Sequence, residues 1–410
     1  MGPQRLHLVV LGSGFGAFTV VTGVGTEYDV TVVSPRNHFL FTPLLPSTTV
    51  GTIEFRSIIE PIRHARVDVR FFHALAHEID VASRAVSCVS VDGSHAFRLS
   101  YDVLVIAVGA ASSTFGVPGV AEHALFLREL NDARLIRQRI IGCFERANLP
   151  GISPEERSRL LHFVICGGGP TGVEVAAEIH DFFTEDLRRS YPLLVKEARI
   201  IVVEAMKDIL SGFDESLRRY ALEVFRRKHI TVLTDAPVIA VEPTGIVLAD
   251  RTRLSCGLLV WSAGNGPTEF ARTAPLPKDE RGRFLVDDRF LVPTTQNVFA
   301  IGDCSAREHS PLPATAQVAQ QEGKYLAHAL RLRARGRTAE PFRYRHLGML
   351  AYIGGRRALA DLESFKGRGW ATWLFWRSAY LTRLVSAKNK VLVLFDWVKH
   401  RLFGRDISQF

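Results

Sequence analysis

FVICGGGPTGVE at residues 163–174, together with LVVLGSGFGA at residues 8–17, decides the fold of this chain. Each glycine-rich turn follows an apolar run that predicts a buried strand and precedes a pattern that predicts a helix. A strand, a glycine turn and a helix in this order are typical of a site that holds the pyrophosphate of a dinucleotide at a helix N-terminus. The sequence therefore predicts this device twice.

The remaining chain repeats the same plan. Further apolar strands that close in small residues are predicted at 101–110, 257–265 and 297–304. With 410 residues, of which 47% are apolar, the chain is long enough for two hydrophobic cores. We expect an α/β protein with two Rossmann-like dinucleotide-binding domains.

Cysteine usage and hydropathy exclude several classes of protein. The five cysteines are scattered, with no CxxC or CxxxxC pair, which favours a reduced compartment and argues against a disulfide framework, a structural zinc or a dithiol redox centre. No apolar run is long enough for a membrane-spanning helix, and we expect no cleavable leader ahead of Gly12. We expect no metal site.

In the first turn, Gly12 allows the tight bend, Gly14 lets the backbone approach a pyrophosphate, and Gly16 permits close helix packing. The acidic residue expected about 20 positions later is missing. Ser34 stands there, so contact with an adenine ribose would depend on its hydroxyl and on Arg36.

The second turn fits the GxGxxG pattern fully, and the strand after its helix ends in Glu204. A carboxylate that accepts hydrogen bonds from both ribose hydroxyls would repel a 2′-phosphate, so NADH is favoured over NADPH. A solvated acid at the end of a strand is the alternative interpretation of Glu204.

Two dinucleotide sites in one chain suggest a relay in which a nicotinamide delivers hydride to a bound flavin. Asp303 in FAIGDC is placed like an acid that holds the ribityl chain of a flavin. The segment that follows, at 312–327, predicts a helix whose N-terminal amides would face the flavin pyrimidine.

The C-terminal 45 residues carry most of the net charge. From Lys366 to Phe410, nine Lys or Arg face two Asp, which gives +7 of the formal +9, and four of the five tryptophans lie there. Two apolar stripes at helical spacing, the first from Trp373 to Leu384 and the second from Val391 to Leu402, predict two amphipathic helices. We expect them to lie on an anionic lipid bilayer. Core packing or a homodimer seam is the alternative, and no nucleic-acid module accompanies the basic tail.

At this point a family is recognisable. The chain resembles the type II, single-subunit, non-proton-pumping NADH:quinone oxidoreductases of the two-dinucleotide-binding-domain flavoproteins, over nearly its whole length, and most closely their mitochondrial-type branch. The likeness is carried by the segments at 34–63, 107–120, 167–179, 261–265, 299–304 and 313–327.

The resemblance implies a glutathione-reductase-like arrangement with non-covalent FAD and NADH. The FAD domain would be split into 1–115 and 266–345, the NADH domain would span 116–265, and a membrane-anchoring segment would span 346–410. The residues implied for FAD are Gly12, Gly14, Phe15, Gly16, Ser34, Pro35, Arg36, Thr42, Pro43, Gly109, Gly302, Asp303, Ala316 and Gln317. Those implied for NADH are Gly168, Gly169, Pro170, Thr171, Gly172, Glu174, Glu204, Ala263, Gly264 and Asn265.

The catalytic candidates implied by the family are Glu174, Gln317 and Gln321. Glu174 would be a buried acid near the flavin that relays protons to the quinone, and the two glutamines would lie where the flavin meets the quinone channel. The alternative for Glu174 is a first-turn acid that complements the helix dipole.

We therefore expect a peripheral enzyme of the mitochondrial inner membrane or the bacterial cytoplasmic membrane that passes electrons from NADH to a membrane quinone without pumping ions. Two other functions stay open. One is a related NAD(P)H or sulfide flavoprotein with another acceptor, and the other is a non-catalytic flavoprotein of the apoptosis-inducing type.

Overall fold

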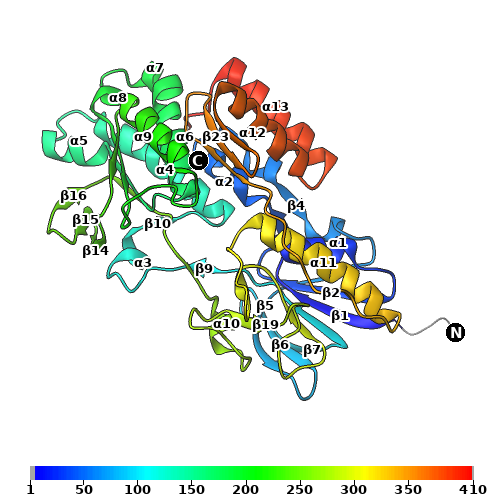
Figure 1. Cartoon of the computed structure of the whole chain (residues 1–410). Helices are drawn as coiled ribbons and strands as arrows, with labels where there is room; N and C mark the ends of the chain where they lie inside the picture. Colours follow the sequence, from blue (N-terminus) through cyan, green and yellow to red (C-terminus); the bar gives the residue numbers. More distant parts are fainter. Residues whose placement is uncertain (1–4, 409–410) are drawn as a thin grey trace. The chain divides into compact units, whose positions relative to one another are not determined.

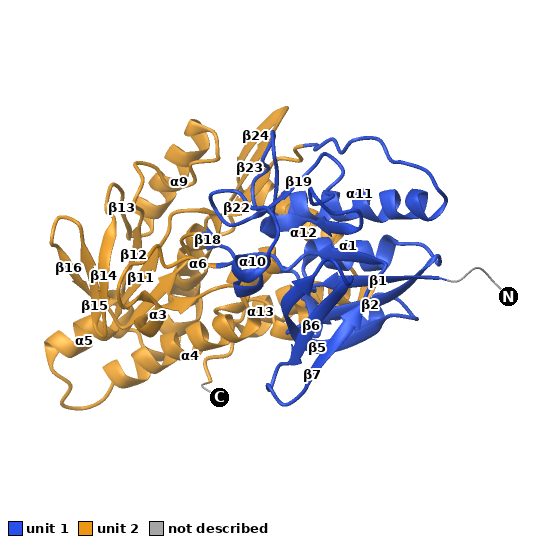
Figure 2. Ribbon diagram, turned by 90° about the horizontal axis from the view of Figure 1, so that it is seen from below, with its two compact units in different colours: residues 1–41, 59–111, 265–345 blue, residues 42–58, 112–264, 346–410 orange. Residues whose placement is uncertain are grey.

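A computed structural model describes residues 5–408, and it confirms the α/β class predicted from the sequence. The chain forms two compact units, each built from several segments (Figure 2). Unit 1 comprises residues 1–41, 59–111 and 265–345, and unit 2 comprises residues 42–58, 112–264 and 346–410. Each unit holds one parallel sheet with a glycine turn.

The sheet of unit 1 has seven strands in the order β20-β8-β1-β2-β5-β6-β7 (Figure 1). Its parallel part consists of β20 (Val298–Ala300), β8 (Val103–Ile106), β1 (Leu6–Leu11), β2 (Tyr28–Ser34) and β5 (Arg70–Asp80). An antiparallel edge is formed by β6 (Ala85–Ser90) and β7 (Ala96–Ser100). The four residues of β8 are all buried, as expected for a parallel strand covered on both faces.

Helix α1 (Phe15–Gly23) packs tightly against α11 (Ala316–Ala334) in unit 1. A Cβ atom on Gly323 of α11 would lie 2.7 Å from the carbonyl oxygen of Gly16, so the two backbones approach too closely for any side chain at that position. The close packing of the two helices therefore depends on Gly323, whereas a Cβ atom on Gly16 would meet the Ile301 side chain at 3.0 Å.

The sheet of unit 2 has five parallel strands in the order β10-β17-β11-β12-β13. These are β10 (Leu125–Phe126), β17 (Leu258–Trp261), β11 (His162–Cys166), β12 (Arg199–Val203) and β13 (Ile230–Leu233). Helices α4 (Leu130–Ala147), α6 (Pro170–Phe182) and α9 (Glu215–Arg227) accompany them, with a small antiparallel sheet of β14 (Val238–Glu242), β15 (Gly245–Leu248) and β16 (Arg253–Ser255).

The C-terminal segment is an integral part of unit 2. It begins with an antiparallel sheet of β22 (Met349–Tyr352), β23 (Ala358–Leu362) and β24 (Phe365–Gly369), and it continues into α12 (Trp370–Arg383) and α13 (Ala387–Phe403) (Figure 1). Helix α13 also packs on the turn η2 (Phe55–Ile58), where Asn389 Nδ2 donates to the Ser57 carbonyl oxygen at 3.0 Å. Because of these contacts, residues 42–58 group with unit 2, whereas the sequence analysis assigned them to the FAD domain.

The two apolar stripes of the tail have different environments. On α12, Trp376 is only 4% exposed, and its ring packs against Tyr352 with the centroids 5.6 Å apart. Trp376 and Leu384 of the first stripe therefore pack inside the protein, as in the alternative that the sequence left open, while Trp373 and Tyr380 are only partly buried. On α13, Val391, Leu394, Phe395, Val398 and Leu402 are all exposed. In the part of the chain that the structure describes, no helix is long and apolar enough to cross a membrane.

Candidate functional site

The first glycine turn has the geometry of a phosphate-binding loop. Gly12 has a φ of 114°, and a Cβ atom there would lie 2.2 Å from the carbonyl oxygen of Ala107, so only glycine fits. Gly14 is the N-cap of α1, and the space on its Cβ side is open to 4 Å. An open approach to the N-terminal amides of a helix fits a pyrophosphate. Phe15 opens the helix and packs edge-on against Phe39.

A cluster of hydroxyl and guanidinium groups lies at the carboxyl end of β2. Ser34 Oγ donates to Ser13 Oγ at 3.0 Å, and Arg36 Nε contacts the same Ser13 oxygen at 3.3 Å. Pro35 accepts a hydrogen bond from His73 Nε2 through its carbonyl oxygen. The arrangement can hold a ribose without a carboxylate. Sequence reasoning missed Ser13, which is the variable residue between the first two glycines.

Other predicted flavin residues of unit 1 follow the neighbouring strands β8 and β20, which are paired in parallel. Gly109 follows β8 with a φ of 66°, while Gly302 and Asp303 follow β20. Parallel strands end at the same edge of a sheet, so these residues lie at the edge where ligands of α/β sheets bind. Ala316 and Gln317 open α11, whose N-cap is Thr315.

Glu322 is a buried acid that sequence reasoning missed. It lies on the buried face of α11, where it accepts a hydrogen bond from the Gly302 amide at 2.6 Å. Burial, together with the charge of Asp303, raises the pKa of this carboxyl to about 8. The signal was present in the sequence, because Glu322 occupies a core position of the helical pattern between Val318 and Leu326.

Gln321 uses both ends of its side-chain amide on the backbone of Arg345. Its Nε2 donates to the Arg345 carbonyl oxygen at 2.9 Å, and its Oε1 accepts from the Arg345 amide at 3.1 Å. The geometry gives Gln321 a structural task within unit 1, and its role at a quinone stays a prediction. Thr42 and Pro43 open the turn η1 (Thr42–Leu44) of unit 2, so their contact with FAD also stays a prediction.

The second glycine turn lies between β11 and α6 in unit 2. Gly167 has a φ of 111°, and a Cβ atom on Gly172 would lie 1.9 Å from the carbonyl oxygen of Gly167. Gly169 is the N-cap of α6 and is open on its Cβ side, while Pro170 and Thr171 form the first helical turn. This turn therefore fits a second pyrophosphate.

Glu204 lies beside that turn at the end of β12. Its Oε2 accepts from the Gly168 amide at 2.6 Å, and its Oε1 accepts from the Met206 amide at 2.8 Å. The two bonds fix the carboxylate at the strand tip and leave each oxygen with further acceptor capacity for a ribose hydroxyl. Ala263 and Gly264 follow β17, and the Ala263 amide faces Gly167. Asn265 belongs to unit 1.

Glu174, the fifth residue of α6, is buried, with 6% of its surface exposed. Its Oε1 accepts from the Tyr352 amide at 3.0 Å. Burial, together with the charge of the nearby Glu178, raises the pKa of its carboxyl to about 8. The geometry is that of a buried acid able to hold a proton near neutral pH, rather than a solvated acid at a helix start.

Two further buried acids lie on the same helix, four and seven residues after Glu174. Glu178 accepts from Ser47 at 2.6 Å and from Thr52 at 2.7 Å, and Arg405 lies 3.8 Å away. Asp181 accepts from the Tyr352 hydroxyl and forms an ion pair with Lys228 at 2.8 Å. Although burial opposes ionisation of Asp181, hydrogen bonds and the Lys228 charge hold its pKa well below the usual range. Sequence reasoning missed both acids, which the spacing on one helix face could have revealed.

The cysteines offer no chemistry of their own. All five are free and buried. Burial raises the pKa of the Cys304 thiol to about 12 and raises that of Cys166 as well. Cys166 belongs to unit 2 and Cys304 to unit 1. Among residues 5–408, no cluster of three or more His, Cys, Asp or Glu side chains could hold a metal ion.

Comparison with known proteins identifies the family. The family described as pyridine nucleotide-disulphide oxidoreductase matches residues 6–323, and the NDH2 C-terminal domain matches residues 346–406. A probable NADH dehydrogenase of Dictyostelium discoideum is 45% identical over 99% of this chain and 92% of its own length. An internal alternative NAD(P)H-ubiquinone oxidoreductase A1, mitochondrial, of Arabidopsis thaliana is 43% identical over 99% of this chain and 86% of its own length.

A solved structure shows the same fold throughout. The structure of NDH2 from Plasmodium falciparum in complex with NADH superimposes with a TM-score of 0.95 at 26% identity, covering 99% of this chain and all of that one. The match includes the C-terminal segment as well as both glycine turns. The chain belongs to the pyridine nucleotide-disulphide oxidoreductase family and, within it, to the NDH2 branch of type II NADH:quinone oxidoreductases that the sequence predicts.

Proposed function

We propose that this protein oxidises NADH with the help of FAD and passes two electrons to ubiquinone at a respiratory membrane, without moving ions. The observation that carries the proposal is the pair of glycine turns, one in each unit, each opening a helix N-terminus at the carboxyl edge of a parallel sheet. The names of the relatives supply the substrates, because they are NADH or NAD(P)H and ubiquinone enzymes.

The residues of unit 1 would hold FAD. Bound FAD would accept a hydride and release two electrons. The amides at the start of α1 bind the pyrophosphate, and Ser34 with Arg36 binds the adenine ribose. Asp303 binds the ribityl hydroxyls. These assignments rest on the open space at Gly14 and on the polar cluster around Ser13.

The residues of unit 2 bind and orient NADH. The start of α6 holds the pyrophosphate, and Glu204 accepts hydrogen bonds from the adenine ribose hydroxyls. The negative charge of Glu204 repels a 2′-phosphate, and this repulsion sets the preference for NADH.

Glu174 holds a proton for the quinone. Reduction of a quinone to a quinol consumes two protons, and a carboxyl with a pKa near 8 is mostly protonated at neutral pH. Because Glu174 is buried, a proton that it releases is replaced through the protein rather than directly from bulk solvent.

The exposed apolar face of α13 docks the protein on the membrane. Lys388, Lys390 and Arg401 of the same helix accompany that face and are attracted to anionic lipid. The proposed location is therefore peripheral, on the mitochondrial inner membrane or a bacterial cytoplasmic membrane. A homodimer would be the other use of this face. Sedimentation without vesicles distinguishes the two uses of this face. A protein that dimerises through this face sediments as a dimer in the absence of lipid, whereas a protein that uses it only for lipid sediments as a monomer.

An anaerobic stopped-flow experiment tests the activity. NADH should bleach the flavin absorbance, and a soluble ubiquinone analogue added afterwards should restore it within the turnover time. Oxygen and sulfide serve as alternative substrates in matched mixtures. If NADH reduces the flavin but every quinone reoxidises it slowly, the proposal is overturned in favour of a non-catalytic flavoprotein. Rapid reoxidation by oxygen alone would indicate an oxidase.

A further inference from the structure

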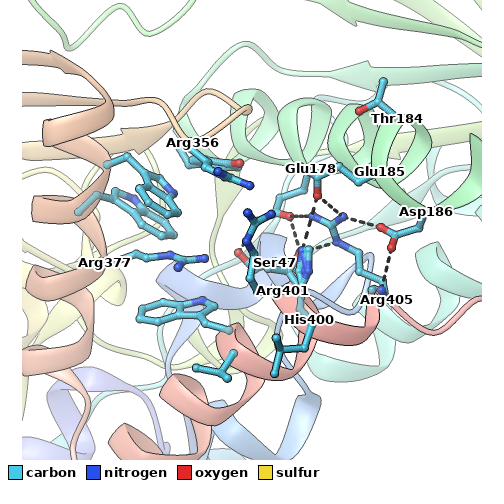
Figure 3. A pocket seen from close by; sticks show the side chains of 18 of the residues that line it. Ser47, Glu178, Thr184, Glu185, Asp186, Arg356, Arg377, His400, Arg401 and Arg405 are labelled. Atoms are coloured by element: carbon cyan, nitrogen blue, oxygen red, sulfur yellow. Dashed lines mark hydrogen bonds and ion pairs between the residues drawn. The ribbon is translucent and has the colours of Figure 1, made fainter.

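A large pocket of unit 2 lies outside both glycine turns. Its volume is about 900 Å³, and Figure 3 shows the side chains that line it. The lining comes from the segment 47–52, from α6 and the helical turns after it, from the hairpin between β22 and β23, and from α12 and α13. The binding of FAD and NADH proposed above does not involve this pocket, although the exposed face of α13 borders it.

One wall of the pocket is aromatic. Trp370, Trp373, Trp376 and Trp397 line it, which are four of the five tryptophans of the chain. The guanidinium carbon of Arg377 lies 4.2 Å from the ring centroid of Trp373 and 4.5 Å from that of Trp397. The two rings hold a cation at the pocket wall by cation–π contacts on both of its faces.

The acids of the pocket are grouped around one arginine. Glu178, Glu185 and Asp186 all pair with one buried residue, Arg405, whose Nη1 lies 2.6 Å from Asp186 Oδ2. Figure 3 shows this cluster on one side of the pocket, away from Arg356 and Arg377. The three carboxylates contact Arg405 rather than those two arginines.

The remaining arginines lack an acidic partner. Arg188, Arg189, Arg356, Arg377 and Arg401 line the pocket, and none of them forms an ion pair with a carboxylate in the described part of the chain. The Nε of Arg377 is buried without a hydrogen-bond partner. In Figure 3, Arg356 and Arg377 lie on the side away from the Arg405 cluster, and Arg401 lies between them and that cluster. Burial lowers the pKa of Arg377 to about 10, and a bound anion would offset the cost of that buried charge.

The rim of the pocket is apolar. Leu394, Val398 and Leu402 line it and are at least half exposed. They continue along α13 into Val391 and Phe395, which are also exposed. A ligand that satisfies both parts of the site needs an anionic head and apolar chains. A neutral quinone ring would leave the arginines unpaired, and free phosphate would leave the rim uncovered.

We propose that this pocket binds the phosphate headgroup of an anionic phospholipid, with Arg356, Arg377 and Arg401 on the phosphate and the acyl chains along the exposed face of α13. The proposal rests on the membrane docking proposed above, and it adds a discrete lipid site to a diffuse attraction. Guanidinium groups suit this ligand because they donate two parallel hydrogen bonds to a phosphate.

Matched variants of the full-length holoenzyme test the site on vesicles. The pocket variant is Arg356→Gln/Arg401→Gln, whose two side chains are exposed, and the control is Arg383→Gln/Lys390→Gln, in the same segment but outside the pocket. Both variants lose two positive charges. The loss of diffuse electrostatic attraction alone therefore weakens the binding of each variant to phosphatidylglycerol vesicles by about 30-fold. We expect the affinity of the pocket variant for phosphatidylglycerol vesicles to fall at least about tenfold further than that of the control. Flavin content, flavin bleaching by NADH and binding to phosphatidylcholine vesicles should be unchanged. Equal losses would overturn the site.

A second measurement does not depend on membrane docking. Dihexanoyl phosphatidylglycerol below its micelle concentration should change the tryptophan fluorescence saturably, because four tryptophans line the pocket. The pocket variant should lose this response and the control should keep it. If the wild type does not bind vesicles but shows the fluorescence response to the short-chain lipid, the proposal of membrane docking is refuted and the proposal of a lipid site in the pocket is retained. No saturable response overturns the pocket, and an equal response to inorganic phosphate at the same concentration overturns the lipid as its ligand.

Discussion

Replacing Glu174 by glutamine should change how the stability of the protein depends on pH. Because the folded protein raises the pKa of this carboxyl from 4.5 to about 8, the folded state binds its proton more tightly than the unfolded state does. The contribution of Glu174 to stability is therefore fully present below pH 4.5 and is lost as the pH rises through 8. The loss amounts to about 1.4 kcal/mol per pH unit, or about 5 kcal/mol in total.

Glutamine keeps an oxygen that accepts from the Tyr352 amide, but it cannot ionise. The free energy of unfolding of Glu174→Gln should therefore match that of the wild type near pH 4.5 and exceed it increasingly up to pH 8. Urea unfolding at half-unit steps from pH 5 to 8.5 measures this difference. The control is Glu215→Gln, which removes a carboxyl with a 71% exposed side chain and should run parallel to the wild type. If the free energy of unfolding of Glu174→Gln also runs parallel to that of the wild type across this pH range, the inference that Glu174 is a buried, protonated acid is refuted.

The remaining predictions concern cofactor choice, flavin retention and membrane docking. Glu204→Gln should narrow the kcat/KM preference for NADH over NADPH, and an unchanged ratio would remove Glu204 from the ribose site. Asp303→Ala should fold but lose FAD during gel filtration, so full flavin occupancy would contradict the assigned role. Val391→Asn/Phe395→Asn should weaken vesicle binding by about 30-fold, or about 2 kcal/mol, because both exposed side chains lose their apolar contact with the bilayer. Sedimentation with vesicles measures this binding, and a result equal to that of the wild type would assign this face another partner.

The glycine turns were predictable because their signal is local. A strand, a tight turn that needs a positive φ at Gly12 or Gly167, and a helix start are all written in about ten consecutive residues. The same holds for Glu204, whose place at a strand end follows from the strand itself. Predictions of this kind require no knowledge of distant parts of the chain.

The surroundings of the tail were not predictable in this way. A helical stripe shows that one face of α12 is apolar, but protein and lipid are equally good covers for such a face. Trp376 packs on Tyr352 because the β22–β23 sheet precedes α12 and supplies a protein surface. Some partners of the tail lie more than three hundred residues away, as Ser57 does from Asn389, and no local pattern records such a pairing.

The long sequence separation between Arg405 and its partners affects the biosynthesis of unit 2. Its Nε donates to the hydroxyl of Thr52, which is 353 residues earlier in the sequence, and its other nitrogens neutralise the buried acids of and after α6. At ordinary translation rates, these acids wait about 10 to 45 s on the ribosome before their counter-ion is synthesised. Unit 2 therefore completes its fold only after Arg405 has been synthesised and has emerged from the ribosome, and a stop codon just before Arg405 would leave buried charge uncompensated at a cost of about 3–5 kcal/mol. Until then the nascent protein exposes incompletely folded surface that chaperones can bind.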